Sequence, residues 1–137
     1  MTAVVWDGKT LAADRKITAG NTLSGYRKKI IKWSGGYFAY AGVLTDAILY
    51  KQFLEDDIET FESDGFHALV VMGKQVFEVT APDYVFLPVF IPTGIGSGGV
   101  QAEVLCRVGY TAKKAIAAVC KWDTSCGGKI DTLEVNN

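Results

Sequence analysis

Short apolar segments separated by tight glycine turns dominate the first part of the chain and restrict the folds open to it. Asp7-Gly8 stands between apolar segments 2–6 and 9–13, and an Asp-Gly pair in that setting predicts a β-hairpin. Segments 26–33 and 37–41, joined by a Ser-Gly-Gly turn, predict a second hairpin. Because such short turns connect antiparallel neighbours, the sequence predicts antiparallel sheets.

The apolar pattern changes to helical spacing after Val43, where Leu44, Ile48, Leu49 and Phe53 recur. Further strands are predicted over 66–72, 75–80, 84–91 and 129–135, and two helices lie between the last two of these, the second capped by Thr111. Strands in runs with grouped helices favour an α+β fold. We expect two packed antiparallel sheets with helices outside them, a four-layer αββα sandwich.

Length and composition limit the classes of function open to the chain. The 137 residues are 49% apolar and 21% charged, which predicts one globular domain over residues 1–137. The net charge of −1 gives no reason to expect nucleic-acid or membrane-surface binding, and no apolar stretch reaches the roughly 18 residues of a membrane span. Three cysteines at no metal-like spacing favour a reducing cytoplasm and no metal site. The single histidine excludes a His-rich zinc site.

Several residues are weak functional candidates when each is taken alone. Thr2 is the second residue of a strand, Asp14 ends a strand, and Lys29 is a lysine in an alternating segment. A Gly-x-Gly-x-Gly-Gly run over 94–99 precedes a helix, where it could cradle a phosphate or form only a tight turn. Cys126 lies in a later glycine loop.

Together these residues resemble, in order along nearly the whole chain, the proteasome β-subunits and the ATP-dependent HslV-type peptidase, which are N-terminal-nucleophile (Ntn) hydrolases. The five matching segments are Ala13–Gly20, Arg27–Ile30, Ala39–Gly42, the serine loop Gly94–Gly99 and the loop Asp123–Gly128. The resemblance implies a shortened bacterial or phage member with the Ntn-hydrolase, proteasome-like fold.

The resemblance also implies catalytic roles. Thr2, exposed by removal of Met1, would be the nucleophile, and its own α-amine the general base. An α-amine with a pKa of roughly 7.7–8.0 is a workable base near neutral pH without histidine. Lys29, held by Asp14, would favour loss of the threonine proton, and the Gly42 N–H would stabilise the oxyanion. Ser97 and Asp123 would anchor the α-amine, with Cys126 in a supporting position.

For the substrate, the resemblance implies that an extended peptide pairs with the Thr18 backbone. Side chains near Ile17, Tyr40 and Leu44 would line the P1 pocket.

The first hairpin predicts how these residues meet. Counting back from the Asp7-Gly8 turn predicts that Thr2 lies opposite Ala13 or Asp14, which would bring the Asp14 carboxylate beside Thr2.

The leading hypothesis is therefore a threonine peptidase or amidase that forms an acyl-enzyme on Thr2 and needs no cofactor. Its expected partners are peptide or unfolded-protein substrates, further copies of the chain, and an ATP-dependent unfoldase. A second hypothesis is a catalytically inactive proteasome-like assembly or binding module, because the first hairpin is short and Cys126 stands where the family has serine. A third is nucleotide binding at 94–99, which the lack of a Walker lysine disfavours.

Overall fold

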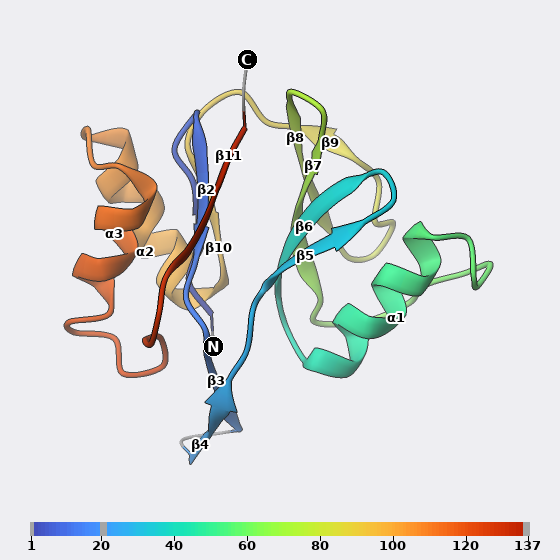
Figure 1. The fold of residues 1–137 in the computed structure, drawn as a ribbon, viewed down its shortest axis with the longest axis horizontal. Coiled ribbons are helices and arrows are strands. Elements are labelled where there is room, and N and C mark those ends of the chain that lie inside the picture. Colours follow the sequence, from blue (N-terminus) through green and yellow to red (C-terminus); the bar gives the residue numbers. More distant parts are fainter. Residues whose placement is uncertain (1, 20–21, 136–137) are drawn as a thin grey trace.

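The computed structural model describes residues 2–19 and 22–135, so the predicted removal of Met1 concerns a residue outside the described part. The described helices are α1 (Leu44–Leu54), α2 (Gly96–Arg107) and α3 (Ala112–Val119) (Figure 1). The strands are β1 (Val4–Trp6), β2 (Thr10–Ala13), β3 (Lys16–Ala19), β4 (Thr22–Tyr26), β5 (Ile30–Trp33), β6 (Gly36–Ala41), β7 (His67–Met72), β8 (Gln75–Thr80), β9 (Leu87–Pro88), β10 (Thr93–Ile95) and β11 (Asp131–Glu134).

The strands form a four-stranded sheet in the order β10-β1-β2-β11, a five-stranded sheet in the order β5-β6-β7-β8-β9, and a separate ribbon of β3 and β4. Every described pair is antiparallel. The α+β class with antiparallel sheets is thus as predicted. The sheets are small and split, however, instead of two continuous ones. Residues 27–29 leave the sheet between β4 and β5, and this breaks the single strand predicted over 26–33.

Successive side chains of a strand face opposite sides of the sheet, so the core has three parts. One face of β1, β2, β6 and β7 forms a cluster between the two larger sheets. The opposite face of β1 and β2 packs against α2 and α3, with Ala3, Val5 and Ala12 fully buried. The opposite face of β6 and β7 packs against α1. In Figure 1, accordingly, α2 and α3 lie outside one sheet and α1 outside the other.

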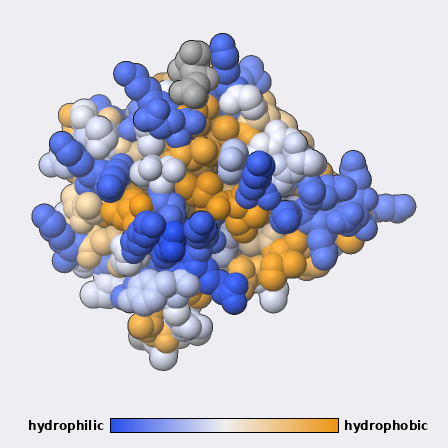
Figure 2. All heavy atoms as spheres, in the orientation of Figure 1, coloured by the Kyte–Doolittle hydropathy of each residue, from blue (hydrophilic) through white to orange (hydrophobic). Residues whose placement is uncertain are grey.

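Only part of the stripe predicted for helix α1 packs against the core, where Leu44 and Phe53 contact the cluster beneath the helix. Ala47 and Tyr50 are its buried residues, whereas the predicted positions Ile48 and Leu49 are 50% and 43% exposed. The Tyr50 ring contacts Phe61 and Phe66, each with ring centroids 5.0 Å apart. The acidic residues that follow α1 form part of a hydrophilic lobe on this side of the molecule (Figure 2).

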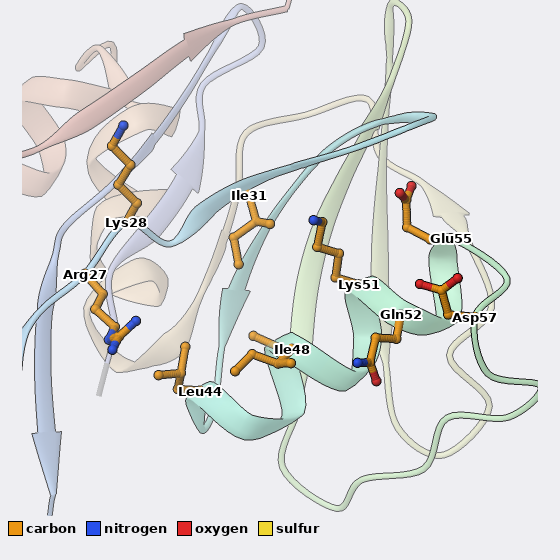
Figure 3. A pocket seen from close by; sticks show the side chains of 10 residues that line it. Arg27, Lys28, Ile31, Leu44, Ile48, Lys51, Gln52, Glu55 and Asp57 are labelled. Carbon is orange, nitrogen blue, oxygen red and sulfur yellow. The ribbon is translucent and has the colours of Figure 1, made fainter.

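A cavity of about 590 Å³ lies between α1 and the segment that precedes β5 (Figure 3). Its lining combines the apolar side chains of Ile31, Leu44 and Ile48 with basic residues such as Arg27 and Lys51. Leu44, predicted to line the P1 pocket, therefore contributes to this cavity.

The register of the first hairpin differs from the prediction. Val4 pairs with Ala13 and Trp6 with Leu11, so the turn is centred one residue later than Asp7-Gly8. The Asp7 carboxylate explains the shift, because its Oδ1 accepts hydrogen bonds from the N–H groups of Lys9 and Thr10 and so closes the turn around Gly8 and Lys9.

Two other boundaries also differ from the predictions. The strand predicted over 84–91 is reduced to β9 at the sheet edge, where Pro88 has no N–H to donate. The glycine run predicted to lead into a helix contains the helix start, because α2 begins at Gly96. The β3–β4 ribbon was not predicted.

None of the described helices is long and apolar enough to cross a membrane.

Candidate active site

Thr2 lies next to the start of α2 and is buried, with 5% of its surface exposed. Its carbonyl oxygen accepts a hydrogen bond of 3.2 Å from the Gly98 N–H. Gly96 has a φ of +79°, and a Cβ there would collide with the same carbonyl oxygen. Only glycine fits both conditions. The glycine run thus packs the first turn of α2 against Thr2.

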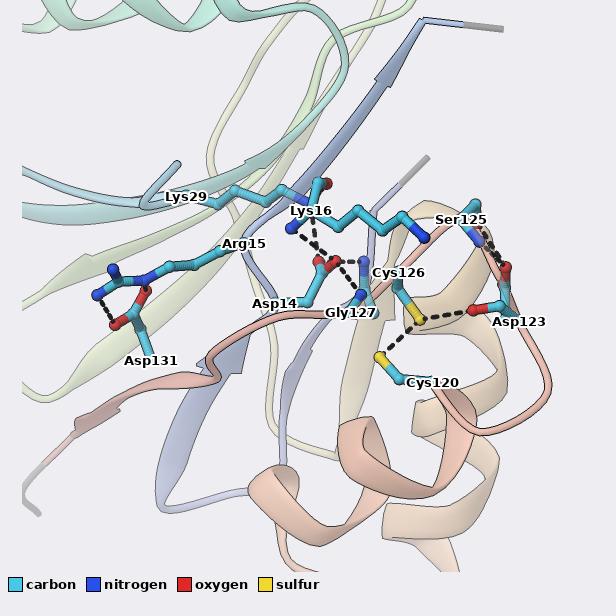
Figure 4. A network of polar contacts seen from close by, with 11 residues as sticks. Asp14, Arg15, Lys16, Lys29, Cys120, Asp123, Ser125, Cys126, Gly127 and Asp131 are labelled. Carbon is cyan, nitrogen blue, oxygen red and sulfur yellow. Dashed lines mark hydrogen bonds and ion pairs between the residues drawn. The ribbon is translucent and has the colours of Figure 1, made fainter. Parts of the chain in front are cut away.

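Asp14 directly follows β2 and is fully buried. Its Oδ1 accepts hydrogen bonds from the Ala3 N–H at 3.0 Å and from Lys29 Nζ at 2.7 Å. Its Oδ2 accepts from the Gly127 N–H at 3.0 Å and from the Lys16 N–H at 3.3 Å (Figure 4). Four donors make a buried carboxylate tolerable, and they join the start of β1 to the loop before β11.

Ala3, and not Thr2, is the residue that faces Asp14. The Asp14 N–H also donates to the Ala3 carbonyl oxygen at 3.1 Å. The prediction that Thr2 lies opposite Ala13 or Asp14 is therefore wrong. The Asp7 carboxylate closes the turn one residue later than predicted, and this changes the pairing of the two strands. The carboxylate still lies beside the N-terminal segment, because it binds the backbone of the residue that follows Thr2.

Lys29 is the cation of this network, and it too is fully buried. Besides Asp14, its Nζ donates to the Lys16 carbonyl oxygen at 2.7 Å. Burial lowers the pKa of Lys29, and the attraction of Asp14 opposes that shift. The two side chains form one buried ion pair between β2 and the chain segment that leads into β5.

A cavity of about 350 Å³ opens at Thr2. Two more of the predicted residues, Thr18 and Gly42, line it, and the other lining residues are Ala41, Val43, Gly65, His67 and Gly96. Gly42 follows β6 with a φ of +136°, and a Cβ there would lie 3.1 Å from the Gly65 carbonyl oxygen. The hydroxyl-bearing Thr2 and the backbone of Gly42 therefore share one cavity.

Tyr40 does not line this cavity, contrary to the prediction. Alternate residues of a strand face opposite sides, so Ala41 faces the cavity side of β6 and Tyr40 faces α1, where it stacks on Phe66. Burial raises the pKa of Tyr40. Leu44 lines the separate cavity beside α1. Ile17 is not among the residues that line the Thr2 cavity, whereas its neighbour Thr18 is.

The structure also gives the described neighbours of Ser97 and Asp123, the predicted anchors of the α-amine. The Asp123 Oδ1 accepts from the N–H and the hydroxyl of Ser125, and Oδ2 from Gln101 Nε2 at 3.3 Å. The Ser125 hydrogen bond holds the pKa of Asp123 below its usual range. The Ser97 Oγ is buried and has no hydrogen-bond partner in the described part of the chain.

Cys126 lies in the same loop, one residue before Gly127, which donates to Asp14. Its Sγ is 2.8 Å from the Sγ of Cys120 and 3.5 Å from the Asp123 carbonyl oxygen (Figure 4). The partner that the structure gives Cys126 is thus a second thiol.

His67 is the cavity residue that the sequence did not single out. Its Nε2 lies 2.7 Å from Glu78 Oε2 on the neighbouring strand β8. The signal that could have found it is strand pairing, because His67 pairs with Ala41, next to Gly42. The only histidine of the chain therefore contributes to the cavity at Thr2 as part of an imidazole–carboxylate pair.

Comparison with known proteins bears on the fold. No protein-family model matches the sequence, and no curated protein matches it either. Among solved structures, the chain is similar to Thiobacillus denitrificans BPH in complex with epoxomicin, with a TM-score of 0.71 over 100% of both chains and 18% identity. The fold is proteasome-like. The fold that the resemblance of the motifs implied is confirmed over the full length.

Proposed function

We propose that the chain is a threonine-type peptidase or amidase, with Thr2 as the nucleophile after removal of Met1. The observation that carries the proposal is that Thr2, Thr18 and Gly42 line one cavity beside the buried Asp14–Lys29 pair. The proteasome-like fold supports it, since a protein of this fold, BPH, has been solved with the proteasome inhibitor epoxomicin. The proposal includes the full four-layer sandwich arrangement of the Ntn hydrolases.

In the proposed reaction, Thr2 Oγ attacks the carbonyl carbon of the scissile peptide bond while the Thr2 α-amine takes the hydroxyl proton. The Gly42 N–H stabilises the oxyanion that forms. Collapse of this intermediate breaks the C–N bond, and the α-amine returns the proton to the departing amine. The remaining ester on Thr2 is then hydrolysed by water, from which the same α-amine removes a proton.

Asp14 and Lys29 support this chemistry without accepting the proton. The Lys29 cation lowers the energy of negative charge that develops on Thr2 Oγ, and Asp14 fixes the position of its ammonium group. Asp14 also binds the Ala3 N–H, which orients the backbone next to the nucleophile. Ser97 and Asp123 are proposed to orient the α-amine once it is free.

The proposed substrate is an extended peptide that pairs with the backbone at Thr18. The other expected partners, further copies of the chain and an ATP-dependent unfoldase, belong to the proposal, as does the cytoplasm as compartment. Ile17, next to Thr18, remains a proposed lining residue of the P1 pocket.

The hydrogen bonds of Asp123 favour a second candidate, a proteasome-like assembly or binding module without turnover. Its carboxylate is engaged by Ser125 and Gln101, and the position of a serine in the family is taken by Cys126. A chain of this kind would keep the fold but leave the α-amine poorly oriented.

The test requires a chain whose first residue is Thr2, which a cleavable N-terminal tag provides independently of methionine removal. Intact-mass measurement after treatment with epoxomicin should show one inhibitor per chain, and peptide mapping should locate it at Thr2. The Thr2→Ala variant should take up no inhibitor and should lose at least about 10³-fold in the turnover of fluorogenic peptides. Thr2→Ser, which keeps a hydroxyl, is the matched control and should retain labelling.

Two results would contradict the proposal. One is a Thr2→Ala variant that hydrolyses peptides as fast as the unchanged chain. The other is a chain with a free Thr2 that takes up no inhibitor and hydrolyses none of the peptides, which would support the binding module. Mass measurement of the untagged chain separately reports whether Met1 is removed.

A further inference from the structure

Cys120 and Cys126 form a pair of thiols that the proposed peptidase chemistry does not use. Cys120 caps the C-terminus of α3, and Cys126 lies in the loop that leads to β11. Their sulfur atoms are 2.8 Å apart. A disulfide bond is about 2.05 Å long, so oxidation requires the sulfurs to approach by less than about 1 Å.

The turn between the two residues produces this proximity. The Cys126 N–H donates to the Asp123 carbonyl oxygen at 3.3 Å, and the Asp123 N–H donates to the Val119 carbonyl oxygen at 2.8 Å. These bonds return the chain to the end of α3 within a few residues. The third cysteine, Cys106, lies in α2 and belongs to no such pair in the described residues.

The two thiols differ in exposure and in charge state. Cys120 is half-buried, whereas Cys126 is 3% exposed. The close contact between the two sulfur atoms lowers the pKa of Cys120 and raises the pKa of Cys126. Among the charged groups that face the pair, Lys29 favours the Cys120 thiolate, and Asp14 and Asp123 oppose it. Cys120 is thus the more accessible and more nucleophilic sulfur.

We propose that Cys120 and Cys126 are a redox pair that a hydroperoxide converts into an intramolecular disulfide. The Cys120 thiolate attacks the hydroxyl oxygen of the hydroperoxide, the O–O bond breaks, and a sulfenic acid forms while the second oxygen leaves as hydroxide or, from an organic hydroperoxide, as alkoxide. The Cys126 sulfur then attacks the Cys120 sulfur and displaces the sulfenic oxygen as water, with the Cys126 proton. Two thiols are oxidised by two electrons, and the peroxide is reduced.

The disulfide would act on the loop that holds Asp14. Gly127 follows Cys126, and its N–H donates to Asp14 Oδ2 while its carbonyl oxygen accepts from the N–H groups of Arg15 and Lys16. A bond from Cys126 to α3 would tie this loop to the helix. Formation of the bond does not depend on peptidase activity, so the inference stands or fails apart from the proposed function.

The sequence offers a direct assay. Trypsin cleaves after Lys121, which separates Cys120 on peptide 115–121 from Cys126 on peptide 122–129. The reduced full-length protein is treated with hydrogen peroxide, its remaining thiols are alkylated, and it is digested without reduction. We expect the two peptides to be joined by a disulfide, an intact mass lower by two hydrogen atoms, and a Cys106 that stays alkylated.

Variants distinguish the order of events. In Cys126→Ser, oxidation of Cys120 should stop at a sulfenic acid that dimedone traps, and Cys106→Ser, the matched control, should form the same disulfide as the unchanged chain. Two outcomes would overturn the proposal: Cys120 and Cys126 both alkylated after peroxide treatment, or peroxide-induced disulfides that join either of them to Cys106 or to a second chain.

Discussion

The buried ion pair between Asp14 and Lys29 should respond unequally to the loss of either partner. Both side chains are fully buried, and Nζ and Oδ1 are 2.7 Å apart. Asp14 has three further donors, the N–H groups of Ala3, Lys16 and Gly127, whereas Lys29 has one further acceptor, the Lys16 carbonyl oxygen. Without Lys29 the carboxylate keeps three N–H donors, but without the Asp14 charge the ammonium group has only neutral oxygen acceptors among the described residues.

The expected magnitudes follow from this difference. Asp14→Asn leaves a buried cation without a counter-charge and should lower the free energy of unfolding by about 3–5 kcal/mol. Lys29→Met replaces the stem of the side chain without its ammonium group and leaves a carboxylate with three N–H donors, so it should lower the free energy of unfolding by about 1–3 kcal/mol. The double variant contains neither charge and should be more stable than the sum of the two effects by at least about 1 kcal/mol.

The pH dependence of the free energy of unfolding tests the same ion pair independently. Burial holds the pKa of Lys29 in the folded chain below its ordinary value of 10.5. In the window just below 10.5, the unfolded chain therefore binds more protons than the folded one, and the contribution of Lys29 to stability rises with pH. Asp14→Asn removes the attraction that opposes this shift, so the deficit of Asp14→Asn relative to the unchanged chain should shrink as the pH rises toward 10.5.

Urea unfolding followed by tryptophan fluorescence measures these differences, near neutral pH and again just below a pH of 10.5. Equal slopes against urea would establish that the variants share one unfolded state. The reasoning fails if Lys29→Met is as damaging as Asp14→Asn, if the two effects add in the double variant, or if the deficit of Asp14→Asn is independent of pH.

Three further predictions concern single residues. Gly96→Ala should lower the free energy of unfolding by more than about 1 kcal/mol and reduce epoxomicin labelling of Thr2, because φ is +79° and the new Cβ would collide with the Thr2 carbonyl oxygen. Tyr50→Phe removes a buried hydroxyl that has no hydrogen-bond partner in the described ranges, so urea unfolding should find it neutral or more stable, whereas Tyr50→Ala should lower the free energy of unfolding by about 3–5 kcal/mol. His67→Ala should change the ratio of kcat/KM between peptides with different P1 side chains by about tenfold or more, mainly through KM, whereas a uniform loss in kcat for all peptides would contradict a role of His67 in the substrate cavity.

Local signals predicted the parts of the fold that local interactions determine. The predicted strand over 75–80 coincides with β8, and Thr111 caps α3 by accepting a hydrogen bond from the Lys114 N–H. The first turn was misplaced because its position depends on one side chain, Asp7, that bonds two backbone N–H groups and also the Ala112 N–H at the start of α3. A contact with a helix about a hundred residues further along the chain leaves no local signal.

The sequence does not predict which side chains of β6 face which side of the strand, and the reason is a different one. Phe38, Ala39, Tyr40 and Ala41 are all buried, because one face of the strand packs between the sheets and the other against α1. A strand buried on both faces has no polar alternation that would tell one face from the other. The place of Tyr40 in the substrate pocket came from the family resemblance alone, because the pattern of β6 does not distinguish the two faces.

The candidate site likewise combines features that have a local sequence signal with features that have none. The motifs of the sequence include Gly42 and the glycine run 94–99, and at Gly42 and Gly96 the positive φ favours glycine. The side-chain partners have no such local signal: Asp123 accepts hydrogen bonds from Ser125 and Gln101, and the Cys126 and Cys120 sulfurs lie 2.8 Å apart. The glycine motifs are compatible with both proposed functions, because the peptidase and the binding module share the fold. The orientation of the Thr2 α-amine is consequently the property on which the two candidate functions differ.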